Sequence, residues 1–325
     1  MCARRMWIVL PACVAALLGS GPAHARTKFD TRPPAVARVV RMQRGEHAVF
    51  TRDGVPVRIQ VSASYPPGPA FEQAFVDFLD TRLHGAELGR LHAVIATPSE
   101  ITTLCGDART LGCYWPAGMQ MFVPGETPPP GFPSREYIVT HEYGHHVATT
   151  RRNEPWFAGS RGPKFWASEM NVCRGIRDGD LGGSYEALPA EAFAGTYARL
   201  HYSGLESWQY SPLLEPTPAA LRAARRDVLR PWRHATTRAY TRRLGPGGAA
   251  RLAVHTPLDG TLRVRARGPR GSRLALKVTA GARTLGSASG ASQASMRLTV
   301  CGERLIRLGI SSSAAGNVAV EVKRP

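Results

Sequence analysis

The residues with the clearest chemical potential lie in one short segment, residues 140–147, which reads THEYGHHV. Two histidines stand four residues apart and a glutamate directly follows the first, which is the H-E-x-x-H pattern. A helix turns by about 100° per residue, so His145 lies about 40° around from His141 and one turn further along. Both imidazoles can therefore reach one metal ion, and we expect that ion to be Zn2+.

The other polar residues of this segment have different predicted roles. Glu142 points about 100° away from His141, so its carboxylate flanks the ion without being a ligand. We therefore expect Glu142 to act as the catalytic base on a water molecule. His146 points about 140° away from His141, and we interpret it as a packing residue or a support for the site.

A third protein ligand is required, because a catalytic zinc ion has three protein ligands and one open position. The metzincin pattern would supply a histidine six residues after His145, but Arg151 stands there, and Ala148 replaces its glycine. Glu191 is the better candidate for the third ligand. It follows Pro189, which marks the first turn of a helix predicted over residues 188–202.

The predicted surroundings of Glu191 also favour this role. Ala194, Gly195 and Ala198 share its side of the helix, and such small residues let two helices approach closely. A carboxylate there is costly unless it is paired or bound to metal. Glu191 could instead be an exposed first-turn acid. In that case three acids of the preceding loop are the alternative ligands: Asp178, Asp180 and Glu186.

Hydrophobic periodicity predicts the elements that position these residues. We expect strands over residues 55–64, 91–96 and 119–123, and helices over 71–83, from Thr97, from Ser134, over 188–202 and over 219–244. The last helix is interrupted at Pro231. This order predicts an α+β domain with a small mixed sheet, an active-site helix and a helical second lobe.

The hydrophobic pattern of the sequence changes after residue 245. Short runs of alternating apolar and polar residues follow, separated by Gly, Ser and Asp-Gly. Strands are predicted over residues 252–254, 262–264, 274–278, 296–300, 305–310 and 318–322. This spacing is typical of an all-β sandwich. We therefore predict a signal peptide over residues 1–25, the α+β domain over 26–245 and the sandwich over 246–325.

The amino-terminal residues indicate export. Two arginines precede an apolar run over residues 7–18, and Ala23-His24-Ala25 forms a cleavage site before Arg26. A lipid anchor on Cys13 is the alternative. No later run is long and apolar enough to span a membrane. We therefore expect a secreted, extracellular protein without a transmembrane segment.

The four cysteines beyond residue 25 are an even number, as expected in an oxidising compartment. Cys105 and Cys113 are close in sequence and predict one disulfide. By elimination Cys173 would pair with Cys301, unless both are buried free thiols.

The formal net charge of +18 favours acidic partners, among them an acidic cell-wall polymer. The arginines are scattered and accompany no nucleic-acid-binding motif, so we expect no nucleic-acid partner. We expect a monomer.

The H-E-Y-G-H-H run at residues 141–146 and the E-x-F-A run at 191–194 resemble the gluzincin clan of zinc metallopeptidases over about residues 91–202. The resemblance implies a zincin-like catalytic domain that acts on a peptide or protein substrate. It also implies that the strand at 119–123 is the sheet edge on which an extended peptide pairs. Gluzincins commonly carry Asp four residues after the third ligand to support the first histidine, whereas this chain has Gly195.

Residues 250–325 resemble the bacterial pre-peptidase C-terminal type of sandwich, through Leu258-Asp259-Gly260 and Val300-Cys301-Gly302. Such domains accompany secreted peptidases, so the expected activity is peptide-bond hydrolysis. Two alternatives stay open: a cell-surface protein that binds wall polymers and has a structural zinc site, and a zinc amidase acting on peptidoglycan stems. The sequence leaves five candidates for stabilising the oxyanion: Tyr185, His201, Tyr202, Tyr210 and His234.

Overall fold

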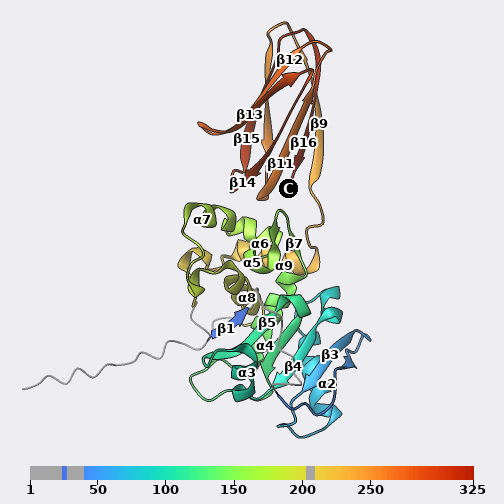
Figure 1. Cartoon of the computed structure of the whole chain (residues 1–325), viewed down its shortest axis with the longest axis vertical. Helices are drawn as coiled ribbons and strands as arrows, with labels where there is room; N and C mark the ends of the chain where they lie inside the picture. The colour runs from blue at the N-terminus through green and yellow to red at the C-terminus, as the bar shows by residue number, and fades with distance from the viewer. Residues whose placement is uncertain (1–23, 28–39, 203–208) are drawn as a thin grey trace, which may run out of the picture.

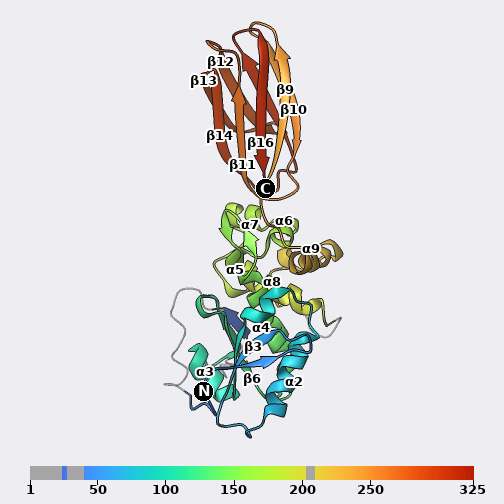
Figure 2. The same ribbon diagram turned by 90° about the vertical axis from the view of Figure 1, so that its right-hand side faces the viewer.

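The computed structural model describes residues 24–27, 40–202 and 209–325. Residues 1–23, which hold Cys13 and nearly all of the predicted signal peptide, lie outside the described residues. The molecule is elongated, with a mixed α+β part at one end and an all-β part at the other (Figures 1 and 2). Within the described ranges no helix is long and apolar enough to cross a membrane.

A six-stranded mixed sheet forms the framework of the α+β part. Its strands lie in the order β1 (His24–Thr27), β5 (Thr110–Trp115), β6 (Gln120–Pro124), β4 (His92–Ala96), β3 (Pro56–Val61) and β2 (His47–Phe50). Strands β3, β4 and β6 run parallel to one another, whereas β5 runs antiparallel to β6. The predicted strands over residues 55–64, 91–96 and 119–123 are thus confirmed, and β1, β2 and β5 are additional.

Helices cover both faces of this sheet. Helices α2 (Pro69–Asp80) and α4 (Arg135–Thr149) share one apolar cluster with β3, β4 and β6. Helix α3 (Pro98–Cys105) packs with apolar residues of the opposite face and begins with the predicted capping box at Thr97. The disulfide between Cys105 and Cys113 joins the end of α3 to β5, as expected.

The prediction that residues 119–123 form the sheet edge is wrong. Strand β6 lies between β4 and β5, and β1 pairs with the outer side of β5. The reason is local, because residues 116–118 form a tight 3-10 turn that folds β6 back against β5.

Short elements separate the sheet from the all-β part. They are β7 (Arg152–Asn153), β8 (Trp156–Phe157), α5 (Ala158–Arg161), α6 (Lys164–Glu169), α7 (Val172–Asp178), η3 (Tyr185–Ala187), α8 (Pro189–Arg199), η4 (Pro212–Leu214) and α9 (Pro218–Leu229). Two further 3-10 helices, η1 (Ala86–Arg90) and η2 (Pro116–Gly118), directly precede the sheet strands β4 and β6. Helix α8 packs against α4, and α9 against α6 and α8. This is the helical second lobe that the sequence predicts.

The all-β part contains two four-stranded antiparallel sheets. One has the order β10 (Ala249–His255), β15 (Leu305–Ser312), β12 (Arg273–Ala280) and β13 (Arg283–Ala291), and the other has β14 (Gln293–Val300), β11 (Gly260–Arg267), β16 (Gly316–Arg324) and β9 (Thr236–Leu244). Residues that point inward alternate with exposed residues, and the inward set forms one apolar core. The sandwich-like region is confirmed.

The predicted helix over residues 219–244 is wrong beyond Leu229, where α9 ends. Thr236–Leu244 forms β9 and pairs along its whole length with β16. The sandwich therefore begins at Thr236 and not near residue 246. Pairing with β16 supplies the backbone hydrogen bonds that a helix would otherwise make, so the partner strand decides the conformation.

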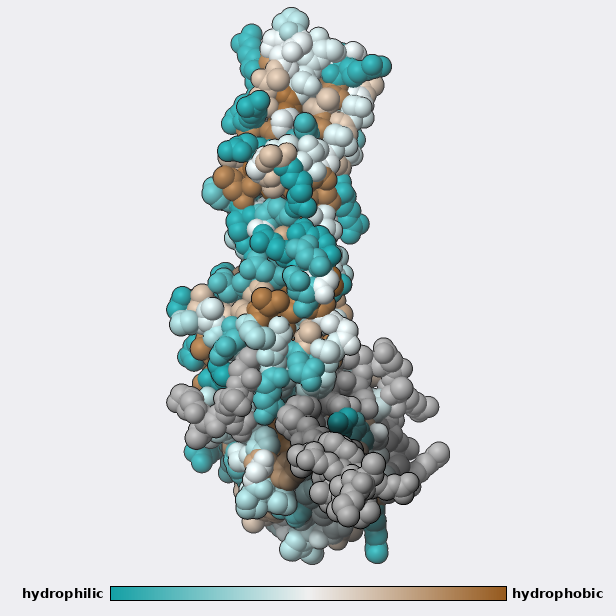
Figure 3. Space-filling view, turned by 90° about the vertical axis from the view of Figure 1, so that its left-hand side faces the viewer, coloured by the Kyte–Doolittle hydropathy of each residue, from teal (hydrophilic) through white to brown (hydrophobic). Residues whose placement is uncertain are grey.

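The two parts are joined by covalent and polar contacts. The expected disulfide between Cys173 and Cys301 connects α7 to the sandwich. Arg304 binds Asp259 at 2.6 Å and the carbonyl of Ser168, so one side chain contacts both parts. Hydrophilic residues surround this narrow waist on the face shown in Figure 3.

Candidate metal centre

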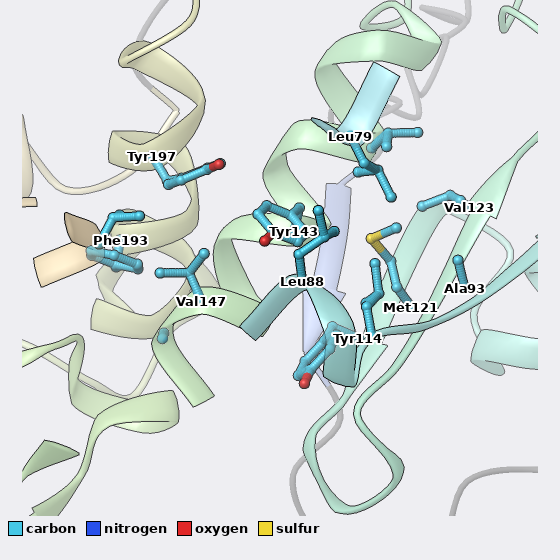
Figure 4. Close-up of a cluster of buried hydrophobic side chains, with 14 of the residues drawn as sticks. Leu79, Leu88, Ala93, Tyr114, Met121, Val123, Tyr143, Val147, Phe193 and Tyr197 are labelled. Atoms are coloured by element: carbon cyan, nitrogen blue, oxygen red, sulfur yellow. The ribbon is translucent and has the colours of Figure 1, made fainter. Parts of the chain in front are cut away.

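Helix α4 carries the two histidines through the centre of the α+β part. The Ser134 hydroxyl accepts a hydrogen bond from the Tyr137 N–H at 3.1 Å and caps its first turn. Residues 138–148 are all buried, because α4 lies between the sheet and α8. In Figure 4 Tyr143 lies between Met121 of the sheet and Tyr197 of α8.

A glycine sets the distance between α4 and α8. A Cβ atom at Gly144 would lie 2.9 Å from the Ala194 Cα and 3.1 Å from the Tyr197 Cβ. Two helices can touch at the backbone only where both have small side chains. The small residues predicted beside Glu191 therefore have their counterpart at Gly144 on α4.

This close approach brings His141, His145 and Glu191 together. Their ligand atoms all lie within 4.8 Å of one another, and each residue is about 1% exposed. Glu191 Oε2 lies 3.4 Å from His141 Nε2 and 3.3 Å from His145 Nε2. The group could hold a metal ion, because two imidazoles and a carboxylate are suitable donors and all three point at one place.

The electrostatics of Glu191 favour its ionised form. Burial alone would raise its pKa, but charge interactions with His145 and hydrogen bonds to both histidines lower it below the usual range. The Tyr185 hydroxyl donates a further hydrogen bond to Glu191 Oε2 at 2.9 Å. Glu191 is therefore prepared to act as an anionic ligand.

Glu142 lies next to this group and is fully buried. Neither of its carboxylate oxygens has a hydrogen-bond partner among the described residues, and His145 Nδ1 has none either. Burial and the nearby charge of Glu191 raise the pKa of Glu142 well above its usual value. Such orphaned buried polar atoms are costly in a closed core, and they fit a site that takes up a metal ion and a water molecule.

Strand β5 supports Glu142 from the other side. A Cβ atom at Gly112 would lie 3.1 Å from Glu142 Cγ and 3.2 Å from Glu142 Oε1. The carboxylate therefore rests against the β5 backbone, and only glycine leaves room for it. The sequence contains no signal for this role, because the contact depends on how the sheet pairs.

His146 faces away from the metal group, as predicted. Its Nε2–H donates to the Glu87 carbonyl at 2.8 Å, and its Nδ1 accepts from the Tyr114 hydroxyl at 3.0 Å. Burial lowers the pKa of His146 to about 4, so the ring is neutral. His146 fixes the rotation of α4 relative to η1 and β5.

Sequence reasoning missed the buried acid Glu87. Its carboxylate binds Arg151 at 2.7 Å and accepts from the Tyr143 hydroxyl at 3.2 Å and the Gly85 N–H at 2.8 Å. Burial would raise the pKa of Glu87, but Arg151 and these hydrogen bonds keep it below the usual value. Arg151 also donates to the Asp227 carbonyl and so ties α4 to α9.

The alternative ligands do not join the metal group. Asp178, Asp180 and Glu186 are exposed, and Asp178 pairs with Arg177 at 2.9 Å. The group within mutual reach contains only His141, His145 and Glu191 among the described residues.

Two of the five candidates for oxyanion stabilisation lie at the metal group. Tyr185 binds Glu191, and the Tyr210 ring lies 6.3 Å from the His141 ring. His201 accepts a hydrogen bond from the Leu83 N–H, so it has a structural role. Tyr202 lies 3.4 Å from the Thr140 hydroxyl, and His234 lines a pocket at the waist.

No protein-family model matches the chain. No curated protein matches it at a significant level. Solved structures give only weak likenesses.

One of them is a Yersinia pseudotuberculosis-derived mitogen, which is 12% identical in sequence and has a TM-score of 0.23. The match covers 28% of this chain and 87% of the mitogen chain. Another is the C-terminal CBM6 of LamC, a marine laminarinase from Zobellia galactanivorans, which is 13% identical in sequence and has a TM-score of 0.21. The match covers 27% of this chain and 100% of the CBM6 chain. At such TM-scores these likenesses carry no conclusion about function.

The helix contact at Gly144 predicts a specific effect on metal binding. In Gly144→Ala the new methyl group collides with the backbone of α8, so we expect a loss of about 1–3 kcal/mol in stability and weaker metal binding. Thermal unfolding and metal titration measure the two effects. Gly45→Ala is the control, because nothing lies within 4 Å of a Cβ atom at Gly45. Wild-type metal affinity in Gly144→Ala would show that the helix spacing does not position Glu191.

Proposed function

We propose that this chain is a secreted zinc-dependent metallopeptidase of the gluzincin type that hydrolyses peptide bonds. The observation that carries the proposal is the buried group of His141, His145 and Glu191 with an orphaned carboxylate, Glu142, beside it. Two imidazoles and one carboxylate are the donors of a catalytic zinc site with an open position. The signal peptide predicted from the sequence and the two disulfides of the structure fit an extracellular protein.

The residues of the site have separate roles in the proposed reaction. His141, His145 and Glu191 would hold the ion, which when bound polarises a carbonyl and lowers the pKa of water to about 7. Glu142 accepts a proton from the attacking water on a carboxylate oxygen and passes it to the leaving amine. Its raised pKa suits this role, because the carboxyl group must both take up and release the proton near neutral pH.

Tyr185 and Tyr210 are the groups we assign to the oxyanion. Their rings lie 6.1 Å apart on one side of the metal group, and burial raises the pKa of both hydroxyls well above the usual value. Both hydroxyls therefore stay protonated. Tyr185 donates its one proton to Glu191 Oε2, so it would have to release Glu191 before it could donate to negative charge that develops on the substrate oxygen.

We place the substrate on β5 instead of β6. The outer side of β5 pairs with β1, which also contacts α4 and α8, so this edge accepts an extended strand next to the metal group (Figure 1). The predicted cleavage before Arg26 would remove only His24 and Ala25 from β1. Arg26 and Thr27 pair with Cys113 and Tyr114, so a substrate strand would have to displace them. A structure of Glu142→Gln with a bound peptide tests the placement, and a peptide paired elsewhere would contradict it.

A wall-polymer-binding protein with a structural metal site is the second candidate. Gly195 favours it, because this position carries no carboxylate to orient His141. A zinc amidase acting on peptidoglycan stems uses the same donors. Hydrolysis assays with peptides and with peptidoglycan stems separate the three.

Metal content tests the ligand assignment directly. We expect about one zinc ion per wild-type chain, and a large loss of zinc in His141→Ala, His145→Ala and Glu191→Ala, because each removes one of three donors. Elemental analysis of the dialysed proteins measures this. Glu186→Ala is the matched control, since it removes an exposed glutamate of the neighbouring loop. Full zinc retention in Glu191→Ala would exclude Glu191 as a ligand.

The role of Glu142 is tested separately from metal binding. We expect Glu142→Gln to keep its zinc and to hydrolyse peptides about a hundredfold to ten-thousandfold more slowly, because the amide cannot accept the proton. Metal analysis and cleavage of a broad peptide library measure the two effects. A wild-type protein that binds zinc but cleaves no peptide would favour the binding-protein candidate.

A further inference from the structure

A strongly cationic pocket lies at the waist, where the α+β part meets the sandwich. Its volume is about 220 Å³, and both parts contribute to its lining. The charged lining residues are Arg152, Glu154, Arg233, Arg263, Arg297 and Lys323. Five cationic side chains thus line the pocket together with one acidic side chain, Glu154, and with Pro325, the last residue of the sequence. Within the described parts of the chain none of the five cations forms an ion pair.

Three of these cations form a row across one sheet. Arg263 of β11 pairs with Arg297 of β14 on one side and with Lys323 of β16 on the other. All three side chains are exposed, while their neighbours Leu262 and Val264 point into the core. Side chains directly opposite each other on antiparallel strands lie about 5 Å apart, so like charges there destabilise the sheet.

The next row of the same face is arranged differently. Arg265 has the carboxylate of Glu321 directly opposite on β16 and Ser295 on β14. This sheet therefore places an acid opposite an arginine two residues from the like-charged row. An anion that lies on the row would offset the repulsion among its three cations.

The α+β part adds a second cationic wall. Arg152 Nη1 donates to the Arg233 carbonyl at 3.0 Å, which holds the two residues together. Beneath them the buried Lys164 donates to the Glu154 carbonyl at 2.6 Å, and its ammonium lies 4.8 Å from the Trp232 ring. The disulfide between Cys173 and Cys301 fixes the two walls relative to each other.

The pocket continues along the outer face of the sheet. A second, more open depression of about 630 Å³ shares Arg263 and Arg297 with it and extends past Arg265 to Gln293. Its lining holds three arginines and one acid, Glu321. A single small anion would fill only the pocket. A chain that carries repeated negative charges would occupy the pocket and the depression together.

We propose that this surface binds a phosphate-bearing glycopolymer, in which sugar or polyol units are joined by phosphodiesters. Guanidinium groups match the oxygens of a phosphate with two parallel hydrogen bonds, and four of the five cations are arginines. Single-stranded nucleic acid needs exposed aromatic platforms for its bases, but the one aromatic lining residue, Trp232, is only 9% exposed. The surface uses none of the metal-site residues, so the proposal does not depend on the peptidase activity.

The test compares two triple variants of the full chain. Arg263→Gln/Arg297→Gln/Lys323→Gln removes the cationic row. Arg251→Gln/Arg273→Gln/Lys277→Gln changes the net charge equally, with the same residue types, at exposed positions of the other sheet. Binding to poly(glycerol phosphate) is measured by calorimetry at two salt concentrations, with neutral dextran and duplex DNA as comparison ligands.

We expect the row variant to bind poly(glycerol phosphate) at least about tenfold more weakly than wild type, and the control variant to stay within about twofold. Far-ultraviolet circular dichroism and zinc content should be unchanged in both. If both variants bound the phosphate polymer equally weakly, the binding would depend on net charge and not on the cationic row, and the proposal would be overturned. Tighter wild-type binding to dextran or to duplex DNA than to the phosphate polymer would also overturn it.

Discussion

The contact between α4 and α8 at Gly144 and Ala194 is the constraint on which the metal centre depends. It brings a carboxylate from one helix against two imidazoles of the other inside a core that excludes water. Charged and polar groups in such a core are stable only when each finds a partner. Glu191 finds its partners in the histidines and Tyr185, whereas the Glu142 carboxylate has none among the described residues. A buried carboxylate without a hydrogen-bond partner favours a site that takes up a metal ion over a purely structural polar cluster.

A second set of buried groups keeps α4 in place. His146 and Tyr143 both bind Glu87, and Arg151 connects the same acid to α9. On the opposite side Gly112 leaves room for Glu142 against β5. Because these contacts fix the rotation of α4, they determine where its histidines point. The proposed catalytic role would need this rigidity, since small displacements of reacting groups slow a reaction strongly.

The waist joins two regions with different proposed tasks. The metal group lies in the α+β part, while the cationic row lies on one sheet of the sandwich and is completed by Arg152 and Arg233. A fixed junction would hold a peptidase at a set orientation on a polymer surface. In the sequence the positive charges are scattered arginines. Antiparallel pairing brings some of them, which are far apart in the chain, into one row on the sheet.

The sequence by itself determined the features that depend on local spacing. Helical periodicity placed His141 and His145 on one face and Glu142 beside them, and alternation predicted most strands of the sandwich. Only the tertiary structure decided which strands pair. Strand β5 pairs on the outer side of β6, and Thr236–Leu244 forms the strand β9. Gly112 and Glu87 both contact α4. These contacts join residues distant in sequence, and their energies come from packing and hydrogen bonding across the fold, which no local pattern encodes.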